Sequence, residues 1–175
     1  GAPLLEREGI AIEGRPTLVR AIHVESIGIG GDSLIHAENG HIAVGPQRLG
    51  PCMATGGSQP SLMDALNVLG LAAFGATDRS LAGLTTMAAE LGCTVEHVAQ
   101  EAVNAAVASL AAKIEHLIRM INTKPVYTIH EILANRDIKP NKLIIIGGPA
   151  VVFQPLLADR LGLEVVVPPL HSVAN

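Results

Sequence analysis

The chain has 175 residues, 49% of them apolar and 16% charged, and its formal net charge is −4. This length allows one domain with a substantial core, while the acidic balance and the absence of tryptophan speak against a nucleic-acid interface. No apolar run reaches the roughly 20 residues of a membrane span. We therefore expect neither nucleic acid nor a membrane as a partner.

The first half of the chain predicts an antiparallel three-stranded meander over residues 17–27, 32–38 and 41–46. The glycine turn Gly28–Gly31 connects the first two strands. The dipeptide Asn39-Gly40 connects the second and third, and it is a strong signal for a two-residue hairpin turn.

Residues 48–75 contain many Gly, Pro, Ser and Met residues without clear periodicity, which predicts a long loop with a helical turn after Ser61. Loops of this length are usually functional or face a partner. Ser80 is then expected to cap a helix over Leu81–Leu91, and Gly92 is expected to end it.

The apolar positions after Thr94 follow a helical period as far as about Ile121, which predicts a long helix with an alanine-rich middle. Thr128 is expected to open a short helix that runs through Leu133. Beyond it, a polar turn covers residues 135–141.

The last third of the chain predicts a strand, a helix and a strand. Lys142–Ile146 is expected to be a buried strand, the helix from Gly147-Gly148-Pro149 to Gly162 follows, and Val165–Val167 is the last strand. The order βββ-α-β-α-β matches a ribonuclease-H-like α/β domain, which is the half-unit of the actin, sugar-kinase and heat-shock-chaperone superfamily.

Both glycine turns are candidate nucleotide sites. Glycines let the backbone approach a bound group closely, and their N–H groups can point at an anion. The second turn also follows the carboxyl end of a strand, where open α/β sheets place ligands. The candidate cofactor-binding residues are Gly28, Gly30, Gly31, Ser33, Gly147 and Gly148. Simple closure of a turn is the alternative interpretation.

Asp32, inside the first turn, has three interpretations. A carboxylate beside a polyphosphate is unfavourable unless Mg²⁺ lies between them, so Asp32 is a candidate metal ligand and catalytic residue. It is otherwise a sign that the turn no longer binds nucleotide, or an ordinary turn residue.

Other chemically active residues carry weaker signals. No pair of the seven histidines has a metal-ligand spacing on one helix, and each is interpreted as a packing or surface residue. Asp64 is interpreted mainly as a helix cap, with contact to substrate or metal as the alternative. Cys52 and Cys93 are interpreted as reduced thiols.

Several glycine-rich and proline-rich segments occur in a fixed order. They are GIGGDS at residues 28–33, GPQRLGP at 45–51, GGSQPSLMDALNVLG at 56–70, GGPA at 147–150 and VPP at 167–169. Together, from about Ile10 onward, they resemble the hydantoinase A / 5-oxoprolinase family. The chain departs from the family pattern at Asp32, where a third glycine is usual, in the segment that includes Leu49, and at Pro149-Ala150.

The resemblance implies an actin-like ATPase fold and a cytoplasmic, ATP-dependent and Mg²⁺-dependent hydrolase. Such an enzyme opens a cyclic amide of the hydantoin or 5-oxoproline type through phosphoryl activation. The superfamily's other phosphate hairpin, Asp-x-Gly-x-Thr, is absent from these residues, so the isolated chain is expected to be inactive. The alternatives are a non-catalytic nucleotide-binding or scaffold module and a half-domain of a small-metabolite kinase.

The apolar composition also suggests partners. A mean hydropathy of +0.40 is high for a domain without membrane spans, which indicates a surface that another domain or subunit covers. We therefore expect residues 1–175 to be a single domain excised from a longer protein, in contact with its remaining domains. We also expect a homo-oligomer that forms through the alanine-rich helix at residues 95–121.

Overall fold

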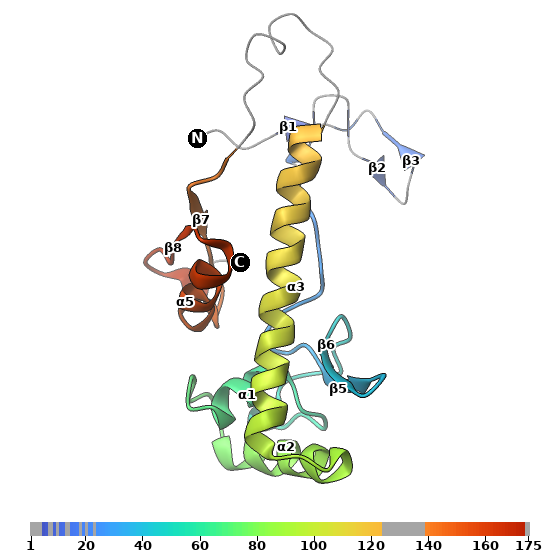
Figure 1. Cartoon of the computed structure of the whole chain (residues 1–175), viewed down its shortest axis with the longest axis vertical. Coiled ribbons are helices and arrows are strands. Elements are labelled where there is room, and N and C mark those ends of the chain that lie inside the picture. The colour runs from blue at the N-terminus through green and yellow to red at the C-terminus, as the bar shows by residue number, and fades with distance from the viewer. Residues whose placement is uncertain are drawn as a thin grey trace, which may run out of the picture.

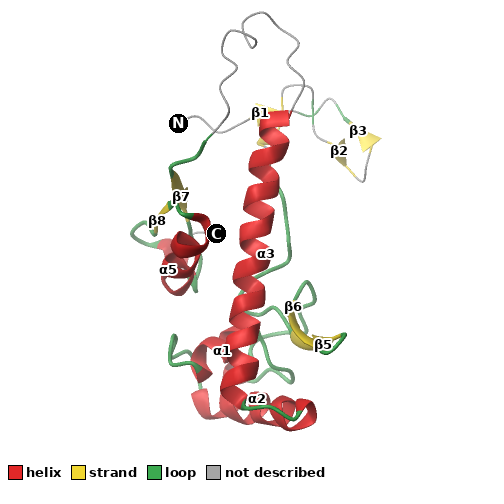
Figure 2. Ribbon diagram, in the orientation of Figure 1, coloured by secondary structure: helices red, strands yellow, loops and turns green. Residues whose placement is uncertain are grey.

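The computed structural model shows a mixed α/β chain arranged around one long helix, α3 (Val95–Thr123) (Figure 1). Helices α1 (Leu62–Val68) and α2 (Thr77–Leu91) lie at its N-terminal end (Figure 2). The structure describes residues 5–6, 9, 11–12, 15–17, 19, 21–22, 24–123 and 139–173.

The hydrophobic core lies where α1, α2 and the N-terminal half of α3 meet. Leu62 and Leu66 of α1 and Leu84 of α2 are completely buried. The buried residues of α3 all lie between Val98 and Ala111, and most of them are alanines. Alanine lets neighbouring helices approach closely, so the alanine-rich stretch of α3 forms the centre of the chain's own core.

The predicted Asn39-Gly40 hairpin is confirmed. β5 (Ile35–Glu38) pairs antiparallel with β6 (His41–Val44), and Ile35 faces Val44 in the register. Asn39 and Gly40 both have positive φ, at 50° and 80°, as a two-residue turn with the twist of the strands requires.

The first strand of the predicted meander, over residues 17–27, does not join the hairpin in the described residues. Within 17–27, only β4 (Ala21–Ile22) is a strand, and its partner is β1 (Leu5–Glu6). The carboxylate of Glu25 instead pairs with Lys113 of α3 at 2.7 Å. Contact with a helix therefore replaces the expected pairing with β5.

A second short pair accompanies this one: β2 (Ala11–Ile12) pairs antiparallel with β3 (Arg15–Pro16). Each of the four sheets in the described part of the chain has two strands. The mixed α/β class is thus confirmed, whereas the ribonuclease-H-like meander is not seen.

The predicted helices that fall within the described residues are confirmed, but one of their predicted starts is wrong. α2 begins at Thr77, four residues before the expected start, and Ser80 is a buried residue inside the helix instead of its cap. Gly92 ends α2 with φ 66°, as predicted. Thr94 accepts a hydrogen bond of 3.2 Å from the N–H of His97 and so caps α3.

The C-terminal part forms the predicted strand, helix and strand. β7 (Lys142–Ile144) and β8 (Glu164–Val166) pair in parallel, and α5 (Ala150–Leu161) connects them. Pro149 precedes the helix, and Gly162 ends it with φ 64°. This unit lies beside α3 (Figure 1), and α5 contacts α3.

The predicted burial of Lys142–Ile146 holds for one side of the strand only, since Leu143 and Ile145 pack against the core. Ile144 is 64% exposed and Ile146 is 56% exposed. Parallel sheets are ordinarily covered on both faces, whereas in the described residues only the face of this pair that carries Val165 packs against the core. Two of the four apolar residues in the run, Ile144 and Ile146, are therefore left exposed.

The short helix predicted over Thr128–Leu133 lies outside the described residues. Within the described parts of the chain, no helix combines the length and the hydropathy that crossing a membrane requires.

Candidate functional site

The hydroxyl of Ser33 holds the turn Gly28–Ser33 in shape. It accepts a hydrogen bond of 2.8 Å from the N–H of Gly30 and donates one of 2.9 Å to the carbonyl of Gly28. The N–H of Ser33 also donates to the Gly30 carbonyl at 3.0 Å, and Ser33 is fully buried. Ser33 therefore shapes the turn, and its hydroxyl is already engaged inside the chain.

The N-terminus of α1 holds the carbonyls on one side of the turn. The N–H of Met63 donates to the carbonyl of Gly31 at 2.8 Å, and the N–H of Leu62 donates to that of Ser33 at 2.9 Å. N–H groups in the first turn of a helix have no partner inside that helix. These bonds therefore give a partner both to the N–H groups of α1 and to the carbonyls of the turn. Because C=O and N–H of a planar trans peptide point in opposite directions, the N–H of Asp32 points away from α1.

The N–H groups of Gly31 and Asp32 have no hydrogen-bond partner among the described residues. Successive free N–H groups form concavities that bind anions. Close packing behind the turn favours glycine there. A Cβ on Gly28, whose φ is 67°, would lie 2.7 Å from the Cβ of Pro46, and one on Gly31 would lie 3.1 Å from the side chain of Met63. The turn thus presents two free donors on a rigid support.

Asp32 forms an ion pair with Arg48, whose Nε lies 3.4 Å from Oδ1 of the carboxylate. Both side chains are about half exposed, at 45% and 50%, so the pair contributes at most about 1 kcal/mol to stability. A Cβ on Gly30 would lie 2.9 Å from the guanidinium. Sequence reasoning missed Arg48, which lies in the GPQRLGP segment without any local sign of its partner.

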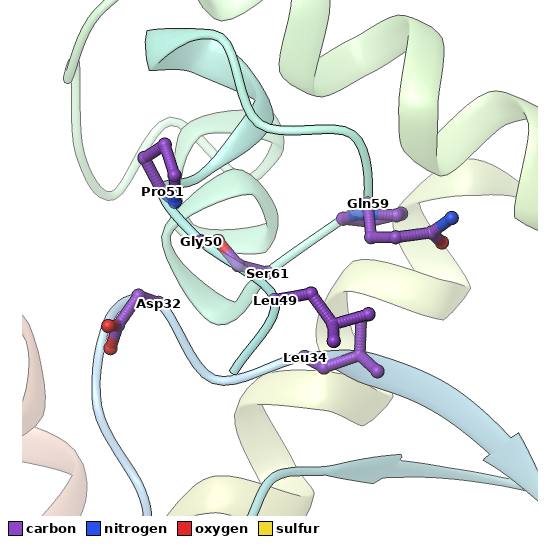
Figure 3. A pocket seen from close by; sticks show the side chains of 8 residues that line it. Asp32, Leu34, Leu49, Gly50, Pro51, Gln59 and Ser61 are labelled. Carbon is purple, nitrogen blue, oxygen red and sulfur yellow. The ribbon is translucent and has the colours of Figure 1, made fainter. Parts of the chain in front are cut away.

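A small hollow lies beside Asp32 (Figure 3). Asp32 lies at one side of it and Gln59 at the opposite side. Its volume is about 10 Å³, which is enough for about one water molecule. The hollow is therefore too small to enclose a nucleotide-sized ligand. The lining residues are Asp32, Leu34, Leu49, Gly50, Pro51, Gln59, Pro60 and Ser61.

Asp64 connects the elements behind the turn. Its fully buried carboxylate accepts hydrogen bonds from the N–H groups of Met53, Ala54 and Ser61 at 3.0, 3.1 and 2.9 Å. The hydroxyls of Ser61 and Ser80 donate two more, at 3.0 and 2.6 Å. The predicted capping role at α1 is confirmed. The bonds to Ala54 and Ser80 were missed, because those partners are 10 and 16 residues away.

The second turn has its own hydrogen bonds. The N–H of Gly147 donates to the carbonyl of His171 at 2.8 Å, and the Nδ1 of His171 lies 3.0 Å from the carbonyl of Gly147. Gly148 has no neighbouring atom within 4 Å of the place where a Cβ would be. No hydrogen bond or ion pair connects the two turns in the described residues.

The chemistry of the first turn fits an anion better than a bare metal ion. Two free N–H groups and the guanidinium of Arg48 are donors that suit phosphate oxygens. The described residues contain no group of three or more His, Cys, Asp or Glu that could hold a metal ion. Mg²⁺ often takes only one or two carboxylates together with waters and phosphate oxygens, so Asp32 fits this ion only alongside a bound phosphate.

One family model, described as hydantoinase/oxoprolinase, matches residues 3–175. The matched span includes both glycine turns and Asp64. A comparison with curated proteins finds no match.

Proposed function

The chain belongs to the hydantoinase/oxoprolinase family, and from this premise we propose that it is the phosphate-contacting part of an ATP-dependent hydrolase. The substrate class is a cyclic amide of the hydantoin or 5-oxoproline type. The family is of the hydrolase type, which supports ring opening by water. The observation that carries the assignment of ATP is the pair of free N–H groups at Gly31 and Asp32 beside the guanidinium of Arg48.

In this proposal, Gly31 and Asp32 donate their N–H groups to phosphate oxygens. Gly28, Gly30 and Ser33 keep the turn in the shape that presents these donors. Bound ATP would supply a phosphoryl group for activating the amide carbonyl, so that water can open the ring. Electrostatic stabilisation of that group is the main task of protein residues in phosphoryl transfer.

Asp32 has a second role in the proposal, as the carboxylate that holds Mg²⁺ next to the phosphates. Its present partner is the guanidinium of Arg48, a half-exposed pair of low strength. Phosphate oxygens would attract the guanidinium and release the carboxylate for the metal ion. Both groups would then change partners without a change in the backbone.

Gly147 and Gly148 would lie against the nucleoside. The space around both positions is open, since no atom lies within 4 Å of a Cβ built on either. The turn also follows β7 at its carboxyl end and opens α5, a place where open α/β sheets bind ligands.

An NMR titration of this chain with Mg²⁺–ATP tests the proposal. We expect the backbone amide signals of Gly31 and Asp32 to shift together with those of Gly148, with a dissociation constant of about 1 mM for half a site. The amide of Gly40 lies in a hairpin turn elsewhere and serves as the internal control. Unchanged signals of Gly31 and Asp32 at about 10 mM nucleotide would contradict the proposal.

Two substitutions of Asp32 separate its interpretations. If Asp32 holds Mg²⁺, Asp32→Ala lowers ATP turnover by the full-length protein with hydantoin or 5-oxoproline about tenfold or more, and added Mg²⁺ restores part of it. If Asp32 repels nucleotide, Asp32→Gly strengthens ATP binding. Turnover and binding within about twofold of the parent in both variants would exclude Asp32 from the site.

A further inference from the structure

The outer face of α2 is exposed and carries no charge over most of its length. α2 lies across the N-terminal end of α3 (Figure 1) and buries Ser80, Leu84 and Ala88. Its opposite side is exposed to solvent, and no charged residue occurs between positions 80 and 89. The exposed residues in this stretch are Leu81, Ala82, Thr85, Thr86 and Ala89.

The two threonines on this face add little polarity. The hydroxyl of Thr85 donates to the carbonyl of Leu81 at 2.7 Å, and that of Thr86 donates to the carbonyl of Ala82 at 3.1 Å. Their hydrogen-bonding capacity is therefore partly used within the helix. Depletion of charge is the compositional sign of the centre of a protein–protein interface.

The loop before α2 holds the backbone of an exposed phenylalanine in a fixed place. Phe74 is 51% exposed and Leu71 is 46% exposed. The buried amide of Asn67 donates to the carbonyl of Phe74 at 2.9 Å and accepts from its N–H at 3.0 Å. A Cβ on Gly75 would lie 2.6 Å from the carbonyl of Ala54, so the loop also packs closely on the chain. Rigid, exposed aromatic residues are typical anchors of interfaces, since little entropy is lost when they bind.

Charged residues flank the uncharged face, Asp78 and Arg79 before it and Glu90 after it. Arg79 and Glu90 are exposed, and neither has an ion-pair partner in the part of the chain that the structure describes. Together with Ala82 and Thr86 they are spaced by three or four residues, which places all four along one side of the helix. The two charges are roughly 17 Å apart along α2, too far to pair within one chain.

We propose that this face binds a second copy of the chain, with the two α2 helices packed antiparallel about a twofold axis. A twofold axis near Leu84 and Thr85 places Arg79 of each copy opposite Glu90 of the other, which forms two equivalent ion pairs. This charge complementarity selects a second copy over an unrelated partner.

The proposed dimer contact on α2 differs from the contact expected from composition, which was the alanine-rich helix at residues 95–121. The alanine-rich stretch of α3 is buried in the chain's own core, where Ala99, Ala102 and Ala106 are completely inaccessible. The buried side of this stretch is therefore already occupied, and the exposed alanines Ala108 and Ala112 lie on its other side. The smaller α2, with Ala82 and Ala89 exposed, keeps its outer side available for close approach.

Sedimentation velocity with charge-reversal variants tests the proposal. The parent is expected to be a dimer at about 100 μM protein, and Arg79→Glu or Glu90→Arg alone to raise the dimer dissociation constant about tenfold or more, because each places like charges at both symmetric contacts. The double variant, and an equimolar mixture of the two single variants, restore dimers. Arg160→Glu, on the exposed side of α5, is the matched control and leaves the constant within about twofold.

A variant of the aromatic anchor provides an independent measurement. Phe74→Ala keeps the backbone bonds to Asn67 and should also raise the dissociation constant about tenfold. Far-UV circular dichroism checks that each variant is folded. A monomeric parent, or a failure of the two single variants to form dimers when mixed, would overturn the proposal. A dimer that none of these substitutions weakens places the interface elsewhere and overturns it as well.

Discussion

The two glycine turns differ in what requires their glycines. In the first, a Cβ on Gly28, Gly30 or Gly31 would come within 2.7 to 3.1 Å of a neighbouring atom. In the second, nothing lies within 4 Å of a Cβ on Gly147 or Gly148, and only the φ of 117° at Gly147 requires glycine. The first turn is thus fixed by what packs behind it, and the second by its own backbone.

This difference suits the two turns to different kinds of ligand group. The first turn has buried support from Ser33 and the N-terminus of α1, and it presents free N–H groups with little freedom to move. The second turn is bound mainly to His171 and faces open space. A fixed turn suits recognition of a small anion of defined geometry, while an open one leaves room for a larger group.

The largest expected effect comes from removing the support behind the first turn. Asp64→Ala leaves five buried or partly buried donors without their acceptor, and we expect a loss of about 4 kcal/mol or more in the free energy of unfolding. Urea unfolding followed by circular dichroism measures it. Asp159→Ala, on the exposed side of α5, should change stability by less than about 0.5 kcal/mol. Similar results for both variants would refute the role of the network.

A smaller loss is expected for Gly28→Ala. The alanine must keep the left-handed φ of 67°, and its Cβ must displace Pro46, whose ring cannot rotate away. We therefore expect the free energy of unfolding to fall by about 3 kcal/mol. Gly40→Ala is the matched control, because Gly40 has φ 80° but no atom within 4 Å of a Cβ. Its cost of about 1 kcal/mol reflects backbone strain alone. Equal costs at the two positions in urea unfolding would show that packing does not constrain the first turn.

The smallest effects distinguish the residues of the second turn. Gly147→Ala is expected to cost about 2 kcal/mol, because an L residue is strained at φ 117°. Gly148→Ala should stay within about 0.5 kcal/mol of the parent, since Gly148 lacks a positive φ and has open space around it. Thermal unfolding of the two variants side by side checks the order. A larger loss at Gly148 would contradict the description of this turn as open.

The features that could be predicted from the sequence are those whose partners are close in the chain. The turn at Asn39-Gly40, the end of α2 at Gly92 and the cap of α3 at Thr94 each depend on atoms within about four residues. Local residue types determine such contacts almost completely. The first turn is only partly of this kind, because the bonds of Ser33 to Gly28 and Gly30 are local, whereas Pro46 and Met63 behind the turn are distant in the chain.

Predictions failed where the partner is distant. Ser80 was interpreted as a helix cap because serine is common there, but its hydroxyl binds Asp64, 16 residues away. The apolar run at Ile144 and Ile146 was interpreted as buried, but burial depends on which elements cover the sheet. Arg48 carried no local sign that it would pair with Asp32.

By itself, the sequence determined the family, the order of most elements and the two glycine turns, because these follow from local residue types and their spacing. Only the tertiary structure decided which polar groups of the first turn are engaged and which are free. A hydroxyl, an N–H group or a carboxylate looks the same in the sequence whether it is satisfied or not. Its availability is set by the side chains and helix ends that the fold brings next to it, as Ser33 and Asp64 demonstrate.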